Sequence, residues 1–249
     1  MKKEKRLGIH ETLNVAAWNV RCIGNNESEL VEEIKIKGIY IAVISETKKK
    51  LKGTKMIGNY SMPQSGVSKE TRAQSGAALI IDNKWTSRIT NYSFVNDRIV
   101  TVRLKTNRAH ITTIGVYAPE EGKEEEMRRF YQQLQKEIDK YNKSDSLIVS
   151  GNLNARVGNQ PIPNVVGTFG EDCVNRNRQT LREYTSFNDF KIANTFFGKK
   201  EIRKYTWSAL GSKSIIDYII VNRRLKNLVQ DIKIFWGSDI GSDDFLVTS

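Results

Sequence analysis

Short apolar runs rich in Val, Ile, Thr and Tyr recur along the chain, and polar or Gly-containing segments bound most of them. Several runs are continuous rather than alternating, which predicts strands buried on both faces. The expected strands are Leu13–Trp18, Tyr40–Ser45, Ala77–Ile81, Ile99–Leu104, Ile111–Tyr117, Leu147–Ser150 and Ile215–Val221. The sequence shows no repeat and no linker between them, so we expect one domain over residues 13–249, preceded by a basic extension over residues 1–12.

Helical periodicity occurs between some of these runs. The clearest case is residues 123–141, where apolar side chains recur at helical spacing and charges occupy the other face. A second helix is expected over residues 27–37, with Asn26 and Glu29 as a capping pair and Gly38 at its end. A weaker pattern covers residues 178–190. Many buried strands with few helices predict an α/β fold of packed sheets covered by helices.

Composition narrows the class of protein. The 249 residues are 39% hydrophobic and 27% charged, which is typical of a globular chain. No apolar run reaches the length of a membrane span, and the basic N-terminus has no apolar segment typical of a secretory signal. We therefore expect a nuclear or cytoplasmic protein that is not secreted. Two cysteines and two histidines, scattered singly, predict neither a disulfide framework nor a zinc site.

The charge balance favours an anionic partner. Lys and Arg number 40 against 28 Asp and Glu, which gives a formal charge of +12. Such an excess indicates nucleic acid first and an acidic membrane second, while the plainer interpretation is a solvated surface.

Polar residues cluster where the expected strands end. The first strand is followed by Asn19 and Arg21, the second by Glu46, and the strand at 147–150 by Asn152 and Asn154. Strand ends at one rim of a sheet are where α/β proteins bind ligands. Each residue alone is weak evidence. Asp217 stands out because it interrupts an apolar run, and a buried carboxylate needs a partner.

Taken together and in order, seven segments resemble the endonuclease/exonuclease/phosphatase superfamily. The branch they resemble most is the endonuclease domain of non-LTR (LINE-type) retrotransposons and its host-derived copies of the craniofacial-development-protein type. The segments are Ala17–Arg21, Ser45–Thr47, Val116–Pro119, Gly151–Ala155, Tyr205–Ser208, Ile216–Ile219 and Ser242–Asp244. The resemblance spans residues 13–247, nearly the whole chain.

The resemblance implies a four-layer α/β sandwich with two face-to-face mixed sheets flanked by helices. It also implies a Mg²⁺- or Mn²⁺-dependent phosphodiesterase that nicks double-stranded target DNA for retrotransposition, acts as a monomer and is followed in the full-length protein by a reverse transcriptase. By this resemblance, the metal would be held by Glu46, with Asn19 and Asp243 beside it. The catalytic set would comprise Asn19, Glu46, Tyr117, Asn152, Asn154, Asp217, Asp243 and Asp244.

Two positions depart from the family pattern. The family has Gly-Asp-x-Asn at 151–154 and Ser-Asp-His at 242–244, but this chain has Asn152 and Asp244. An amide cannot accept the proton of an attacking water, and a carboxylate in place of the histidine sets a negative charge against phosphate. We expect severely reduced hydrolysis. We also expect Asp217 to face Asp244, so that one of the two carboxyls has a raised pKa.

Basic residues flank the same segments and would bind DNA backbone phosphates without reading sequence. The expected DNA contacts are Arg21, Lys48, Lys49, Lys50, Arg176, Arg178, Lys204 and Trp207. Two other functions stay open. One is a non-cleaving nucleic-acid-binding descendant of the endonuclease, which Asn152 and Asp244 favour. The other is a small-molecule or lipid phosphatase of the same superfamily, which the charge makes less favoured.

Overall fold

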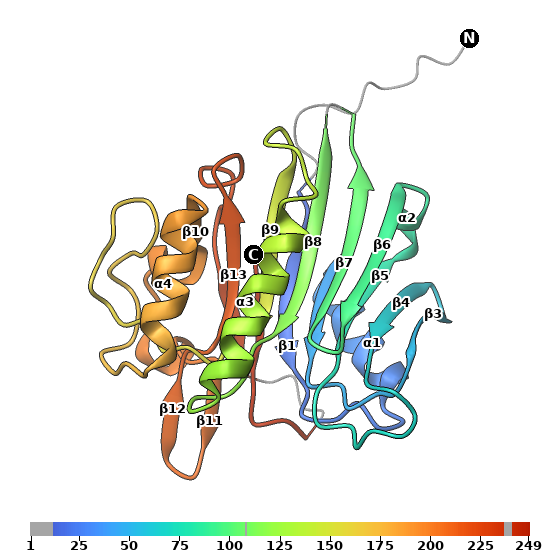
Figure 1. The fold of residues 1–249 in the computed structure, drawn as a ribbon, viewed down its shortest axis with the longest axis horizontal. Coiled ribbons are helices and arrows are strands. Elements are labelled where there is room, and N and C mark those ends of the chain that lie inside the picture. Colours follow the sequence, from blue (N-terminus) through green and yellow to red (C-terminus); the bar gives the residue numbers. More distant parts are fainter. Residues whose placement is uncertain (1–11, 108, 237–240) are drawn as a thin grey trace.

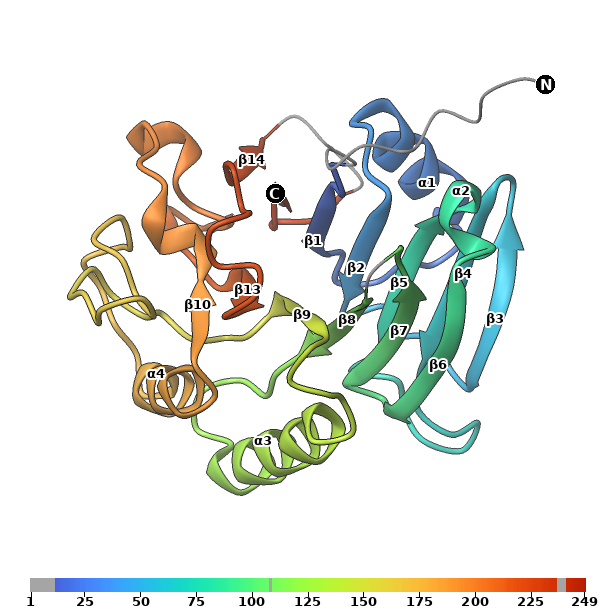
Figure 2. The ribbon, with the colours of Figure 1, turned by 90° about the horizontal axis from the view of Figure 1, so that it is seen from above.

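The computed structural model describes residues 12–107, 109–236 and 241–249. Two large mixed sheets pack face to face and helices cover their outer faces (Figures 1 and 2). The expected α/β sandwich is confirmed. The extension expected over residues 1–12 lies, except for its last residue, outside the described residues.

The first sheet has seven strands. In spatial order they are β14 (Lys233–Phe235), β15 (Leu246–Thr248), β1 (Val15–Asn19), β2 (Ile41–Ser45), β5 (Ala77–Asp82), β4 (Tyr60–Ser65) and β3 (Lys52–Ile57). The second sheet has six strands: β10 (Phe190–Ile192), β13 (Asp217–Asn222), β9 (Ser146–Asn152), β8 (His110–Tyr117), β7 (Ile99–Lys105) and β6 (Ile89–Asn96). A separate hairpin, β11 (Trp207–Ala209) with β12 (Ser212–Ser214), extends from one end (Figure 1).

The helices divide between the two outer faces. The helix α1 (Glu27–Ile36) packs on the first sheet through Leu30, Val31 and Ile34. The helices α3 (Glu124–Ile138) and α4 (Asn177–Phe187) cover the second sheet (Figure 2). Three short elements complete the described chain: α2 (Asn83–Thr86), η1 (Ala193–Phe196) and η2 (Glu201–Arg203). None of the helices in the described ranges has the length and apolarity that a membrane crossing requires.

All seven expected strands are present with slightly shifted ends, because both faces of these runs are buried and the pattern is strong. The expected cap of α1 is wrong: the Asn26 side chain makes no capping hydrogen bond, and only its carbonyl accepts from the Leu30 N–H. The α1 helix does stop before Gly38, whose φ of +64° suits glycine. The α4 helix ends earlier than expected, and Phe190 begins β10 instead.

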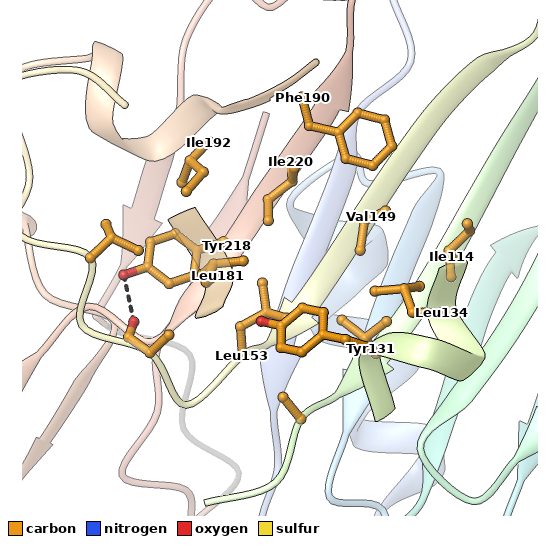
Figure 3. Packing of buried hydrophobic residues seen from close by; sticks show 14 of the residues in the cluster. Ile114, Tyr131, Leu134, Val149, Leu153, Leu181, Phe190, Ile192, Tyr218 and Ile220 are labelled. Atoms are coloured by element: carbon orange, nitrogen blue, oxygen red, sulfur yellow. Dashed lines mark hydrogen bonds between the residues drawn. The ribbon is translucent and has the colours of Figure 1, made fainter. Parts of the chain in front are cut away.

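A buried tyrosine hydroxyl joins two segments of the chain in the core beneath α3 and α4. The Tyr218 hydroxyl lies 2.8 Å from the Ala155 carbonyl oxygen and 2.6 Å from the Ile215 carbonyl oxygen, and the side chain is fully buried among apolar residues (Figure 3). The hydroxyl therefore ties the loop after β9 to the segment that enters β13.

Removing this hydroxyl should destabilise the fold. We expect Tyr218→Phe to lower the free energy of unfolding by about 1–2 kcal/mol, because two buried carbonyl oxygens lose their donor. Urea denaturation measures the change. The matched control is Tyr92→Phe, whose half-buried hydroxyl has a longer contact of 3.3 Å with Ser61 Oγ and should matter less. Equal effects of the two substitutions would contradict the role assigned to Tyr218.

Candidate functional site

The register of the second sheet places three expected site residues in one row. Tyr117 is the β8 partner of Asn152 on β9, and Asp217 is the β13 partner of the same Asn152. Directly paired residues project to the same face of a sheet. Asn152 and Asp217 are fully buried, and Tyr117 is 5% exposed. Three strands that are distant in sequence therefore bring an amide, a carboxyl and a phenol together.

The first sheet contributes the ends of two parallel strands. Asn19 on β1 pairs with Ser45 on β2, and Glu46 follows directly. Arg21 and Glu46 both have positive φ values, 54° and 56°, which is uncommon for residues other than glycine and often marks a functional turn. The Asn19 Oδ1 accepts a 3.2 Å hydrogen bond from the Arg21 N–H, which shapes the first of these turns.

The turn after β9 is built around two asparagines. Asn152 Oδ1 accepts a hydrogen bond of 2.9 Å from the backbone N–H of Asn154. Asn154 has a φ of +47°, and its Nδ2 donates to the Ala118 carbonyl oxygen at 2.8 Å. Gly151 has a φ of +135°, and a Cβ there would lie 2.0 Å from the Val116 carbonyl oxygen, so only glycine fits before Asn152. Within the described part of the chain, Asn152 Nδ2 is buried without a hydrogen-bond partner.

The segment 242–245 brings Asp244 to the same place. The Asp244 carbonyl oxygen accepts from the Trp18 indole N–H at 3.1 Å, and the Asp244 N–H donates to Ser242 Oγ at 3.1 Å. The Asp244 residue is 2% exposed. Among the residues that the structure describes, none forms a geometrically sound hydrogen bond with Asp244 Oδ1 or with either carboxyl oxygen of Asp217.

The sequence predicts a raised pKa for one of the two carboxyls, Asp217 or Asp244, and burial raises the pKa of both. Burial is the main cause that raises the pKa of Asp217 to about 7, against a smaller lowering by the nearby Thr206 and Asp244 side chains. Burial also raises the pKa of Asp244 to about 9, and the negative charges of Asp217, Glu46 and Asp243 add to the effect. Two buried carboxylates that face each other cannot both be ionised at little cost in free energy. We therefore take Asp244, which has the higher pKa, as the group that holds a proton at neutral pH.

The remaining charges at the site are paired. Glu46 Oε1 lies 3.2 Å from Lys48 Nζ, and Asp243 forms an ion pair with Arg21. Burial raises the pKa of the Tyr117 phenol far above its usual range, and the charge of Glu46 contributes to this. Tyr117 therefore remains a protonated hydrogen-bond donor at any physiological pH.

The oxygen donors of the site could take part in binding a divalent cation. No group of three or more His, Cys, Asp or Glu side chains in the described ranges is arranged to hold a metal. Glu46 nevertheless presents a carboxylate that is 18% exposed, and its charge acts on both Tyr117 and Asp244. Mg²⁺ is commonly held by one or two carboxylates together with waters and substrate phosphates, so this donor set fits such an ion.

The expected DNA-contacting residues differ in how free their charges are. Lys49 Nζ lies 2.8 Å from Glu27 Oε1, and Lys50 Nζ donates to the Lys69 carbonyl oxygen at 2.7 Å. Arg178 Nη2 donates to Gln160 at 2.8 Å. The Arg21 side chain is 54% exposed despite its ion pair, whereas Lys204 is only 21% exposed. Trp207 is half-buried on β11. The basic run after Glu46 is thus partly engaged in contacts with α1 and with the segment between β4 and β5.

Sequence reasoning missed several residues that position the site. Thr206 Oγ1 accepts hydrogen bonds from the N–H groups of Ile216 and Asp217, at 3.0 and 3.2 Å. Asn175 and Asn177 each donate to the Asn154 carbonyl oxygen at 2.9 Å. Thr206 belongs to one of the seven recognised segments, so that signal was available. Asn175 and Asn177 lie in none of the seven segments. They contact Asn154 only because of the fold, so the sequence gives no sign of their role.

Comparison with curated sequences gives two relatives that cover nearly the whole chain. It is 33% identical to craniofacial development protein 2 of Bos taurus over 237 residues, which are 94% of this chain and 40% of that protein. It is 32% identical to craniofacial development protein 2 of Tragulus javanicus, over 94% of this chain and 41% of that protein. The chain therefore spans about two-fifths of the length of these relatives. No protein-family model matches the sequence.

Three solved structures with the same fold are described as two endonucleases and one 3′ phosphatase, and the last of these is bound to DNA. The AP endonuclease LMAP of Leishmania major matches with a TM-score of 0.70 and 15% identity, over 95% of this chain and 86% of that one. The endonuclease domain of TRAS1, a telomere-specific non-LTR retrotransposon, matches with a TM-score of 0.68 and 17% identity, over 95% and 97%. The 3′ phosphatase NExo of Neisseria, bound to a product DNA hairpin, matches with a TM-score of 0.67 and 15% identity, over 95% and 98%.

Proposed function

The chain has the endonuclease/exonuclease/phosphatase fold and is related in sequence to craniofacial development protein 2, and from this premise we propose that it is a DNA-binding phosphodiesterase-type domain with severely reduced hydrolysis. Its ancestral activity would be the nicking of double-stranded target DNA during retrotransposition. The acting unit would be residues 13–249 as a monomer.

One observation carries this proposal: residues from both sheets converge on one rim. The row of Tyr117, Asn152 and Asp217 comes from the second sheet. Glu46 follows the first sheet, and its charge reaches both Tyr117 and Asp244. A phosphodiester site needs a cation ligand, hydrogen-bond donors for phosphate oxygens and a positioned water, and these residue types supply the first two.

Each remaining residue has a role that its contacts support. The Tyr117 phenol keeps its proton and can donate to a phosphate oxygen. Asn154 is held by its bonds to Asn152 and Ala118, so its turn can position substrate or water. Glu46 and Asn19 would hold the divalent cation, with Asp243 beside them in its ion pair with Arg21. A bound cation would neutralise charge that builds on the phosphate oxygens.

The two departures from the family pattern, Asn152 and Asp244, remove the groups that would transfer protons in the reaction. Asn152 uses its Oδ1 to accept from the Asn154 N–H, and its Nδ2 cannot take a proton from water. Asp244 is protonated or negative but never positive, so it cannot supply the charge that a histidine would offer to phosphate. Loss of a general base costs on the order of 10²–10⁴ in rate, and loss of one donor to the charged oxygen about 10²–10³.

Binding to duplex DNA should depend steeply on salt. We expect the logarithm of the binding constant to fall linearly with the logarithm of salt concentration. The double substitution of Arg21 and Lys204 by Gln should reduce the magnitude of that slope by about 2, since each phosphate contact contributes about 1. Fluorescence anisotropy with a labelled duplex at several salt concentrations measures both quantities.

The control replaces two exposed lysines at the opposite ends of the strands. Lys84 lies on α2, next to the end of β5 that pairs with the start of β2, and Lys105 ends β7 opposite the start of β8. Changing both to Gln should leave the slope unchanged. A DNA-binding constant that does not change with salt concentration would contradict a DNA-binding surface at this rim. So would an equal change of the salt slope in the two double variants.

Two alternative functions give different results. A domain that only binds nucleic acid is favoured by Asn152 and Asp244, and it would bind DNA yet gain no nicking when both positions are restored. A small-molecule or lipid phosphatase would instead hydrolyse inositol phosphates or sphingomyelin and bind DNA weakly.

A further inference from the structure

The row of site residues across the second sheet includes a fourth member. Asp217, Asn152 and Tyr117 are partners on β13, β9 and β8. The strand beyond β8 is β7, and Arg98 directly precedes it. The Arg98 carbonyl oxygen accepts a 2.9 Å hydrogen bond from the Tyr117 N–H, so the two residues lie side by side. The row therefore runs from carboxyl through amide and phenol to guanidinium.

The Arg98 guanidinium lies against the Tyr117 ring. Its Cζ is 5.2 Å from the ring centre, which is within the range of a cation–π contact. Arg98 Nη1 also donates to the Tyr117 carbonyl oxygen at 3.3 Å. Burial and the charges of Glu46 and Glu120 raise the pKa of the phenol, whereas the charge of Arg98 lowers it. A basic group is thus in direct contact with the phenol that we expect to donate to phosphate.

The turn that carries Arg98 is held on several sides. Asn96 Oδ1 accepts from the Arg98 N–H at 2.8 Å, and the Asn96 carbonyl oxygen accepts from Ser65 Oγ. The Asp97 carboxylate accepts from Ser75 Oγ. Ser65 ends β4 and Ser75 lies in the loop before β5, so both hydroxyls come from the first sheet and its loops. The backbone of Arg98 is therefore fixed against both sheets.

The guanidinium has more donors than its neighbours accept. Its other contact is a hydrogen bond of 3.3 Å from Nη2 to Glu126 Oε2, on a side chain that is 45% exposed. Both of its hydrogen bonds are longer than usual, and its remaining N–H groups donate to no described residue. The Arg98 side chain is 20% exposed, so a ligand can reach it. Free guanidinium donors in a fixed fork match the oxygens of a phosphate group.

We propose that Arg98 binds the DNA phosphate to which Tyr117 donates, and that it positions the Tyr117 phenol for this contact. The guanidinium would leave Glu126 and donate to one phosphate oxygen while the phenol donates to another. Its planar face, packed on the ring, would hold the phenol in one orientation. The inference rests on the proposed function and adds a DNA-binding residue that lies in none of the seven segments.

The salt dependence of duplex binding tests the phosphate contact. Arg98→Gln should reduce the magnitude of the salt slope by about 1 and weaken binding roughly tenfold. Arg98→Lys keeps the charge and should keep the slope. Arg128→Gln is the matched control, because Arg128 also pairs with a glutamate of α3, Glu125 at 2.7 Å, and it should leave the slope unchanged. A purely structural role of Arg98 would change stability without changing the slope.

A double-mutant cycle in DNA affinity tests the positioning role. Tyr117→Phe removes the hydroxyl and should weaken binding severalfold in the parent. In the Arg98→Gln variant the same change should matter much less, because the phenol is no longer held towards the phosphate. Anisotropy titrations of the parent, the two single variants and the double variant give the coupling. Additive effects of the two substitutions would overturn the positioning role.

Failure of this inference and failure of the proposed function give different results. If the parent binds DNA with a salt slope that Arg98→Gln leaves unchanged, while the Arg21 and Lys204 double variant lowers it, the inference is wrong and the DNA surface stands. If the parent shows no salt-dependent DNA binding, the proposed function is wrong and the inference fails with it.

Discussion

The double substitution Asn152→Asp with Asp244→His is expected to raise the rate of DNA nicking by about 10²–10⁴-fold. An aspartate at position 152 would keep the acceptor that holds the Asn154 N–H and add an oxygen able to take a proton from water. A histidine at position 244 would face Asp217, whose carboxyl oxygens are buried without a hydrogen-bond donor in the described chain. The restored pair would replace two buried carboxyls of which one must hold a proton.

Conversion of supercoiled plasmid to the nicked form in Mg²⁺ measures this gain. Each single substitution should recover less than the pair, because catalytic groups that act as a unit are not additive. Adding Glu46→Ala to the double variant should abolish the gained activity, which excludes a contaminating nuclease. Robust nicking by the unaltered chain would refute the claim of impairment. A correctly folded double variant without any gain would refute the assignment of residues 152 and 244.

Replacing Asp244 by Asn should stabilise the protein at neutral pH by about 2–4 kcal/mol, which is unusual for a substitution at a buried site. The physical reason is the raised pKa of Asp244, about 9. In the unfolded chain this carboxyl is ionised and hydrated at pH 7, whereas folding forces it to take up a proton beside Asp217. An amide has nearly the same shape and needs no proton.

The raised pKa of Asp244 also determines how the stability of the protein depends on pH. Because the folded state holds the Asp244 proton more tightly than the unfolded state, this group opposes folding increasingly as pH rises from about 4 towards 9. Below the unfolded pKa the penalty vanishes. Urea denaturation at pH 5, 7 and 8.5 should show that Asp244→Asn gains most at the two higher values. An Asn variant that is less stable than the parent at pH 8.5, or one whose gain is the same at all three values, would contradict the buried pair.

The sequence predicts the central strands well and the edges poorly. Runs such as residues 77–81 and 99–104 are continuous and apolar because both faces of these strands are buried between a sheet and a covering layer. Strand β3, at the edge of the first sheet, alternates half-buried and exposed residues and contains Lys52 and Lys55. Its hydrophobic signal is therefore weak, and only pairing with β4 defines it.

In the candidate site too, the sequence predicts the residues that belong to short motifs but not the contacts between distant segments. The motifs name Asn152 and Asp217, and the register of β9 with β13 makes them neighbours. No local pattern reveals that Asp243 is paired with Arg21 or that Asn177 supports Asn154, because these contacts join segments distant in sequence. The expected cap at Asn26 fails for a related reason: a spacing of residue types allows a hydrogen bond without requiring it.

Anomalous scattering from Mn²⁺ in crystals of the double variant, Asn152→Asp with Asp244→His, tests the central claim most directly, since it locates the cation without relying on activity. We expect a single strong peak against the Glu46 carboxylate, on the rim where Asn19, Tyr117 and Asn154 meet. A peak elsewhere on the protein, with none beside Glu46 at saturating Mn²⁺, would contradict it.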